Sequence, residues 1–444
     1  MPRAQSSTSA PVAKTRRPPI LWDVVAEHLD EAGWLWEQRA ESLLALDQTL
    51  VDLETGDEGR MLAHLDGLVV GGAEVARGVL LPALQGDEPR AAAGAAWALL
   101  AAEGGDWLPQ VLDAFIDGKE DLRPAIRTAL ELSPRADLDA KLLERLPAAP
   151  LEAKRELVEA LAARGANAGA ALLSVPYRDD APLHVAVVRA ARTDAAVARV
   201  LLPVALNESA PSVREAALEI GMALGLRSAL DVARKALERG EVSRAALLAA
   251  AVGGEASDLQ LLTACVGKLA TREEALWALG FSGRRAAAEA AVDAARAGAG
   301  RIAAEAFAMV TGCKLGLEAP VEPGASSEGT LRSSSRLPGP VWPEEELDAD
   351  LLEFWWARDG AAIPAGGRFW FGERMATSAD LLHLLERAPM RYRPAFALEL
   401  SARTRGQCRV DVGALAARQR SQVSAARSLA PVGLDRPFSA LFGV

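Results

Sequence analysis

Between residues 86 and 314, the chain repeats one pattern of polar and apolar positions. Each unit has a polar or acidic turn, then in most cases an arginine, then a stretch rich in Ala and Leu that predicts a helix. These stretches lie at 88–104, 121–133, 152–165, 181–194, 210–225, 241–254, 270–283 and 300–312. Second helical segments separate them, as at 107–118, 138–146 and 229–240. Two helices per unit predict an array of helix pairs.

The recurring arginine makes the period explicit. It stands at Arg90, Arg123, Arg155, Arg214, Arg244, Arg272 and Arg301. The successive intervals are 33, 32, 59, 30, 28 and 29 residues. The interval of 59 spans two periods, and the unit at 181–194 lies inside it without an arginine at this position. A pair of helices about every 30 residues is the signature of an α-solenoid.

The repeat phrase carries a family resemblance. SVREAALEIGMALG, residues 212–225, resembles the HEAT repeat, especially its short phycobilisome-lyase-type form. The resemblance covers about half the chain, and it implies an α-α superhelix without naming an activity.

A second resemblance spans the whole chain. The matching phrases are LWDVVAEHLDEAGWLWEQRA near the start, AHLDGL at 63–68, FAMVTG at 307–312, and RFWFG and RYRPAFALEL near the end. With them the chain resembles an uncharacterised proteobacterial HEAT-repeat family linked to type VI secretion gene neighbourhoods. That family supplies a context and no catalytic residues.

The segments outside the repeats differ in composition. We expect a disordered tail at 1–19, an N-terminal helical cap at 20–85, about eight repeats at 86–315, a Gly/Ser/Pro-rich linker at 316–346 and a small α+β segment at 347–444. In the last segment GGRFWFG, 366–372, predicts a short strand or tight turn, and GQCRVDVGA, 406–414, a second strand pairing with it. The predicted fold is an all-α solenoid with an α+β appendix.

Charge and cysteine content limit the partners and the cellular compartment that we expect. The net charge is -11 and the pI is about 5.2. Nucleic-acid phosphates bind to positively charged surfaces, so the overall negative charge of the chain disfavours binding to nucleic acid. Cys265, Cys313 and Cys408 lie far apart, which fits a reducing compartment. No apolar stretch predicts a transmembrane helix or a secretion signal. We therefore expect a cytoplasmic protein that does not bind membranes.

No pattern of catalytic residues stands out. The four histidines lie outside any nucleophile motif, no His-Glu dipeptide suggests a di-iron site, and no phosphate-binding glycine loop occurs. His28 and His64, each followed by Leu-Asp, are either packing positions or a paired site between two helices. We expect no cofactor, no metal, no small-molecule substrate and no enzymatic activity.

The candidate partner-binding residues are arginines and tryptophans. The recurring arginines either pair with acidic residues of neighbouring repeats or form a stripe that grips an acidic partner. The C-terminal tryptophans either fill a small core or anchor an interface, and the C-terminal arginines are a solvated face or a docking patch. The candidates are Arg155, Arg214, Arg244, Arg301, Trp355, Trp356, Trp370, Arg391 and Arg393.

These patterns favour a non-catalytic scaffold or adaptor. Its concave face and its C-terminal appendix would bind a protein with an acidic or apolar surface. The family resemblance implies a partner from a type VI secretion system. Two alternatives remain open. One is an enzyme whose site is assembled across repeats. The other is a nucleic-acid-binding protein that uses the C-terminal arginine cluster, the nine arginines between residues 387 and 427.

Overall fold

Two rows of helices, an inner and an outer one, make up most of the chain. The computed structural model describes residues 20–102, 105–313 and 349–442. The predicted tail and the predicted linker lie outside them. The inner row contains α6 (Pro89–Ala101), α8 (Arg123–Leu132), α10 (Leu151–Arg164), α11 (Ala181–Ala190), α13 (Pro211–Ala223), α15 (Arg244–Gly253), α17 (Arg272–Gly280) and α19 (Gly300–Thr311). Each inner helix packs against the next.

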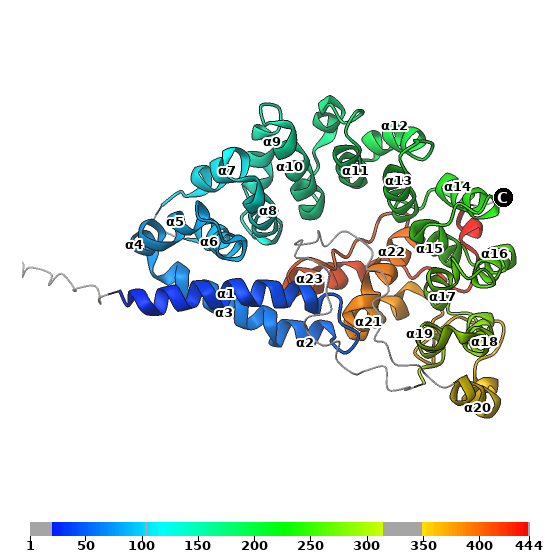
Figure 1. Cartoon of the computed structure of the whole chain (residues 1–444). Coiled ribbons are helices and arrows are strands. Elements are labelled where there is room, and N and C mark those ends of the chain that lie inside the picture. The colour runs from blue at the N-terminus through cyan, green and yellow to red at the C-terminus, as the bar shows by residue number, and fades with distance from the viewer. Residues whose placement is uncertain (1–19, 103–104, 314–348, 443–444) are drawn as a thin grey trace, which may run out of the picture.

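The outer row packs between and behind these helices. It contains α7 (Leu108–Asp117), α9 (Leu138–Arg145), α12 (Ala195–Ala205), α14 (Arg227–Glu238), α16 (Ala256–Val266) and α18 (Arg285–Ala294). Short turns of helix join the two rows at η2 (Glu120–Leu122), η4 (Ala191–Thr193) and η5 (Ala295–Ala299). A further short turn, η3 (Gly169–Ser174), lies between the inner helices α10 and α11. The rows together form a curved helical-repeat array, drawn from blue through cyan and green to yellow-green in Figure 1.

Alanine explains the close packing of the inner row. In α15 every residue from Ala245 to Gly253 is buried, since neighbours cover it on several sides. The small side chains let the helix axes approach, and Gly254 ends the helix in the left-handed conformation, at φ 72°. The Ala-rich stretches of the sequence are therefore the inner helices.

The N-terminal hairpin, α1 (Trp22–Ser42) against α3 (Asp57–Val70), extends the inner row at its first end. α1 packs on both α3 and α6. Shorter elements complete this region: α2 (Leu50–Thr55), α4 (Gly72–Val75), η1 (Ala76–Leu80) and α5 (Leu81–Leu84). In Figure 1 the N-terminal hairpin crosses the open side of the arc.

The C-terminal segment, residues 349–442, returns to the inner side of the arc. It contains α20 (Ala349–Asp359), η6 (Gly360–Ala362), β1 (Phe369–Trp370), β2 (Glu373–Arg374), α21 (Ser378–Arg387), η7 (Met390–Tyr392), α22 (Arg393–Arg403), α23 (Ala416–Ala426) and η8 (Phe438–Phe442). Figure 1 shows α21, α22 and α23 between the N-terminal hairpin and the inner row, with α20 at the far end of the array. The predicted all-α fold with a small C-terminal appendix is confirmed.

The predicted pairing of 366–372 with 406–414 is wrong. β1 pairs instead with β2, which follows it directly, in the register Phe369 opposite Arg374. Phe371 and Gly372 form the connecting turn with φ of 52° and 79°, the backbone that a two-residue hairpin requires. Residues 406–414 form no strand and run across the inner face.

Within the described part of the chain, no single helix is long and apolar enough to cross a membrane. Leu50–Val70 and Gly72–Leu84 together reach the required length and composition, but the chain bends by 99° between them. Their apolar side chains, such as Leu65 and Leu80, are buried in the protein core.

Candidate functional site

The inner face of the array is covered over much of its length by the chain itself. Ser401 donates a hydrogen bond to the carbonyl oxygen of Ala223 (2.8 Å), and Arg403 donates one to that of Val252 (2.8 Å). The Phe369 amide donates to the carbonyl oxygen of Gly283 (2.7 Å). These bonds tie the C-terminal segment to the ends of α13, α15 and α17. The concave face, which was expected to bind a partner, is therefore covered by the chain itself in this part of the array.

Trp370 lies at the buried centre of the C-terminal segment. Its side chain is 0% exposed. The Arg368 guanidinium stacks over the indole at 4.6 Å, and the Phe396 ring packs edge-on at 5.0 Å. Arg368 also pairs with the buried carboxylate of Glu399. Trp370 is thus a core residue in this structure rather than part of a surface.

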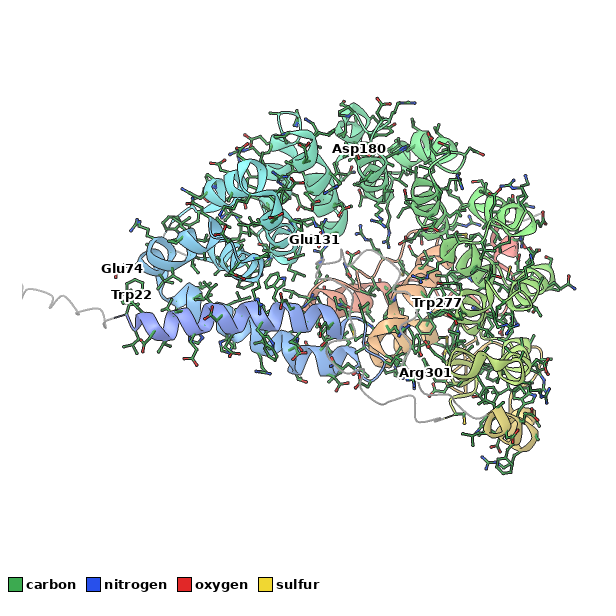
Figure 2. All side chains as sticks on the ribbon, in the orientation of Figure 1. Trp22, Glu74, Glu131, Asp180, Trp277 and Arg301 are labelled. Carbon is green, nitrogen blue, oxygen red and sulfur yellow. The ribbon has the colours of Figure 1, made fainter. Side chains whose placement is uncertain are left out.

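Arg391 and Arg393 are also buried. Arg393 donates to the carbonyl oxygen of Leu385 (2.7 Å), and burial lowers its pKa to about 10. Arg391 lies near Glu305 of α19, the carboxyl whose pKa burial raises. The half-buried Arg301 lies near the same carboxyl, and Figure 2 shows it turned towards the C-terminal helices. Arg391 and Arg301 therefore lie at the contact between α19 and the C-terminal segment, whereas Arg393 is bonded within that segment, to α21.

The remaining candidate arginines pair within the array. Arg244, the first residue of α15, forms a bidentate ion pair with Glu274 of α17. Its Nε and Nη2 atoms lie 2.6 and 2.7 Å from the two carboxylate oxygens. Arg214 donates to the carbonyl oxygens of Glu208 and Ser209 in the preceding turn. Arg155 pairs with Glu156, its neighbour on α10 (2.9 Å). Of these three arginines, Arg244 pairs with an acidic residue of the next repeat, as one of the two interpretations of the repeat pattern expects. Arg214 and Arg155 have partners closer in the sequence.

Trp355 and Trp356 hold α20 against the end of the array. Both rings pack edge-on against Phe307 of α19, at 5.3 and 5.9 Å between centroids, and Arg285 stacks over Trp356 at 4.7 Å. Both tryptophans are half-buried as a result. The adjacent Phe354 is 62% exposed to solvent.

Leu351 and Phe354 form the outward face of α20. Leu351 is 46% exposed and lies three residues before Phe354, so the two share one side of the helix. Arg358 stacks over the Phe354 ring at 5.5 Å. Sequence reasoning selected the two tryptophans and missed Phe354, because FWW gives no sign of which aromatic residue faces the array.

A buried acidic cluster lies where α8 meets α10. Arg127 pairs with Glu156 at 2.7 Å, with Glu131 at 3.1 Å, and with Glu159. Glu131 is buried, and burial raises its pKa to about 7, with Glu156 and Glu159 adding repulsion. Figure 2 places Glu131 on the inner side of the array. Three carboxyls around one guanidinium make this cluster sensitive to pH.

The two N-terminal histidines do meet. His28 of α1 and His64 of α3 lie with their Nδ1 atoms 3.1 Å apart. Among the residues that the structure describes, no group of three or more His, Cys, Asp or Glu side chains could hold a metal ion. The structure therefore pairs these histidines without the neighbouring carboxylates that a metal site would add.

Comparisons with known proteins add little. A scan against protein-family models gives no match, and a search of the curated proteins gives none. Human deoxyhypusine hydroxylase in complex with glycerol, a solved structure, aligns with 57% of this chain and 96% of its own at 18% identity, with a TM-score of 0.23. A likeness this distant carries no argument. The helical-repeat architecture is established by the packing described above.

Proposed function

We propose that this protein is a non-catalytic scaffold of the HEAT-repeat type, and that a protein partner docks on the outward face of α20. One observation carries the proposal: Leu351 and Phe354 are exposed side by side on α20, the helix that covers the far end of the array. The last helix of a repeat array ordinarily turns a polar face to solvent. Neighbouring exposed apolar side chains at such an end mark an interaction site.

The packing of α20 against the array is compatible with a docking surface on its outward face. The tryptophans on its other side fix the helix on Phe307, so Phe354 is presented from a rigid support. Charged residues flank the apolar pair, including Arg296 with Glu353, and Arg358. An exposed aromatic residue with a charged rim has the composition of an interface anchor. The partner would supply apolar side chains to meet Phe354 and polar groups around them.

The alternative of nucleic-acid binding has less support. Several arginines of the C-terminal cluster are engaged by acidic groups: Arg409 by Asp411, Arg420 by Glu54, and Arg427 by Glu386. Others, such as Arg393 and Arg403, are buried. Phosphate contacts need exposed cations, so we retain a protein as the partner. From the family resemblance alone, we propose that this partner belongs to a type VI secretion system.

The test is a comparative capture experiment. Tagged full-length protein would be recovered from cells that carry its gene, as wild type, as Phe354→Glu and as Leu269→Glu. Leu269 is 81% exposed in the turn between α16 and α17, which makes it a matched control. We expect a specific partner that binds the wild type and Leu269→Glu and is lost with Phe354→Glu. Equal recovery of every bound protein by all three chains would contradict the proposal.

A further inference from the structure

A cavity of about 110 Å³ lies where the C-terminal segment crosses the inner row. Its walls come from α10, the end of α11 with η4, α13, α22 and residues 409–414. One water molecule needs a cavity volume of roughly 10–15 Å³. The cavity therefore has room for several waters or for one small polyatomic ion. Five charged side chains line it: Arg189, Arg192, Glu219, Arg409 and Asp411.

Two of these five charges neutralise each other. Arg409 donates to the Asp411 carboxylate (2.6 Å) and to the carbonyl oxygen of Ala162 (3.0 Å). Asp411 also accepts a hydrogen bond from Gln422 (2.9 Å). This pair holds the 409–414 stretch against α10 and contributes no net charge to the cavity.

Arg189 and Arg192 have no such partner. The Arg189 Nε atom is buried without a hydrogen bond, and neither guanidinium has an ion pair within the described ranges. Burial and the nearby Arg409 together lower the pKa of Arg192 to about 10, although Asp411 and Glu219 act in the opposite direction. A guanidinium stays charged at neutral pH. The cavity therefore contains two cations that lack a direct counter-ion.

Glu219 cannot balance both of them. Burial raises the pKa of this carboxyl, Arg189 and Arg192 favour its charged form, and Glu215 opposes it. Even when ionised, Glu219 supplies one negative charge against two guanidinium groups. The cavity thus keeps an excess of positive charge.

We propose that this cavity is a binding site for a small oxyanion held between Arg189 and Arg192. A partly buried cation without a counter-ion is costly, and an anion in the cavity would offset that cost. The planar guanidinium group matches oxyanions through paired hydrogen bonds. The volume suits inorganic phosphate, sulfate or the carboxylate of a small organic acid. This site is separate from α20 and does not depend on the scaffold function.

The test is isothermal titration calorimetry on the full chain at constant ionic strength, with inorganic phosphate, sulfate and acetate as separate ligands. We expect saturable binding of at least one anion, and the order of affinities distinguishes a tetrahedral anion from a carboxylate. Arg192→Met and Arg189→Met should each weaken binding about tenfold or more, because each removes a charge-assisted hydrogen bond. Arg227→Met, on the exposed side of α14, should bind as the wild type does.

A second variant keeps the test decisive if an arginine variant fails to fold. Glu219→Gln removes the competing negative charge and should tighten anion binding. Weaker binding by Glu219→Gln would overturn the proposal. So would Arg192→Met that folds and binds as the wild type does, or the absence of saturable binding of all three anions to the wild type.

Discussion

Arg39 of α1 donates a hydrogen bond of 2.9 Å to the carbonyl oxygen of Ala414, 375 positions further along the chain. The same guanidinium pairs with Glu58 of α3 at 2.8 Å. The second oxygen of Glu58 accepts from the backbone amide of Ala416 (2.7 Å). One buried ion pair therefore joins both helices of the N-terminal hairpin to the C-terminal segment and closes the open side of the arc.

Arg39→Met should be strongly destabilising. It leaves Glu58 buried without its partner, which costs about 3–5 kcal/mol of the free energy of unfolding. Urea denaturation measures the loss, and hydrogen exchange should accelerate at residues 413–416. Arg145→Met is the control, because Arg145 and Asp113 form an exposed pair that contributes about 0–1 kcal/mol. Equal losses in the two variants would argue against this role for Arg39.

Glu399→Gln should loosen the centre of the C-terminal segment. The Glu399 carboxylate faces both Arg368 and Arg403, and all three residues are buried. Without its charge, two buried guanidinium groups face each other, so we expect a loss of about 3–5 kcal/mol. Thermal and urea denaturation measure it. Glu373→Gln, in the exposed pair with Arg387, should cost about 1 kcal/mol or less, and a similar cost at both sites would contradict the expectation.

Glu131 should make stability fall as pH rises. Its pKa is about 7 in the folded protein, while a glutamate in an unfolded chain titrates near about 4.3. Between these values the folded state holds one more proton than the unfolded state. The free energy of unfolding therefore decreases by up to about 1.4 kcal/mol per pH unit across this window, and not further above it.

The Glu131→Gln variant isolates this effect. Arg127 keeps Glu156 and Glu159 as partners, so the substitution leaves no unpaired cation. Relative to wild type, Glu131→Gln should gain stability steadily from pH 5 to pH 7 in urea denaturation. A stability difference that stays constant with pH would show that Glu131 does not titrate in this range.

Arg244→Met tests the two interpretations of the recurring arginines. The Arg244–Glu274 pair is about one-third exposed on each side, so its loss should cost about 0.5–1 kcal/mol. We expect partner capture to be unchanged, because the guanidinium is engaged within the array. Loss of capture with unchanged stability would instead favour an arginine stripe that contacts the partner.

The sequence predicts the array well because its signal is local and repeated. Arg123, Arg244 and Arg272 each stand at the first residue of an inner helix, as the regular spacing of the arginines implied. Gly254 ends α15 as a left-handed cap because glycine alone adopts that backbone without cost. Short-range periodicity and turn chemistry are sufficient for these elements.

Contacts between residues far apart in the chain produce no such local pattern in the sequence. Nothing near Arg39 in the sequence indicates that its partners include Ala414, and the arginines from 391 to 427 gave no sign of which are buried. Arg189 and Arg192 lie in the repeat unit that lacks the recurring arginine, so sequence reasoning passed over them. Their significance arises only when residues 409–414 cover the inner face.

The central claim is that a partner binds the outward face of α20, because the chain's own C-terminal segment covers much of the inner face. A photo-crosslinking amino acid placed at position 354 or at position 155 on α10 tests it in cells that carry the gene. We predict a specific protein adduct at position 354 and none at position 155. An adduct at position 155 alone, or no adduct at either position, would contradict the account.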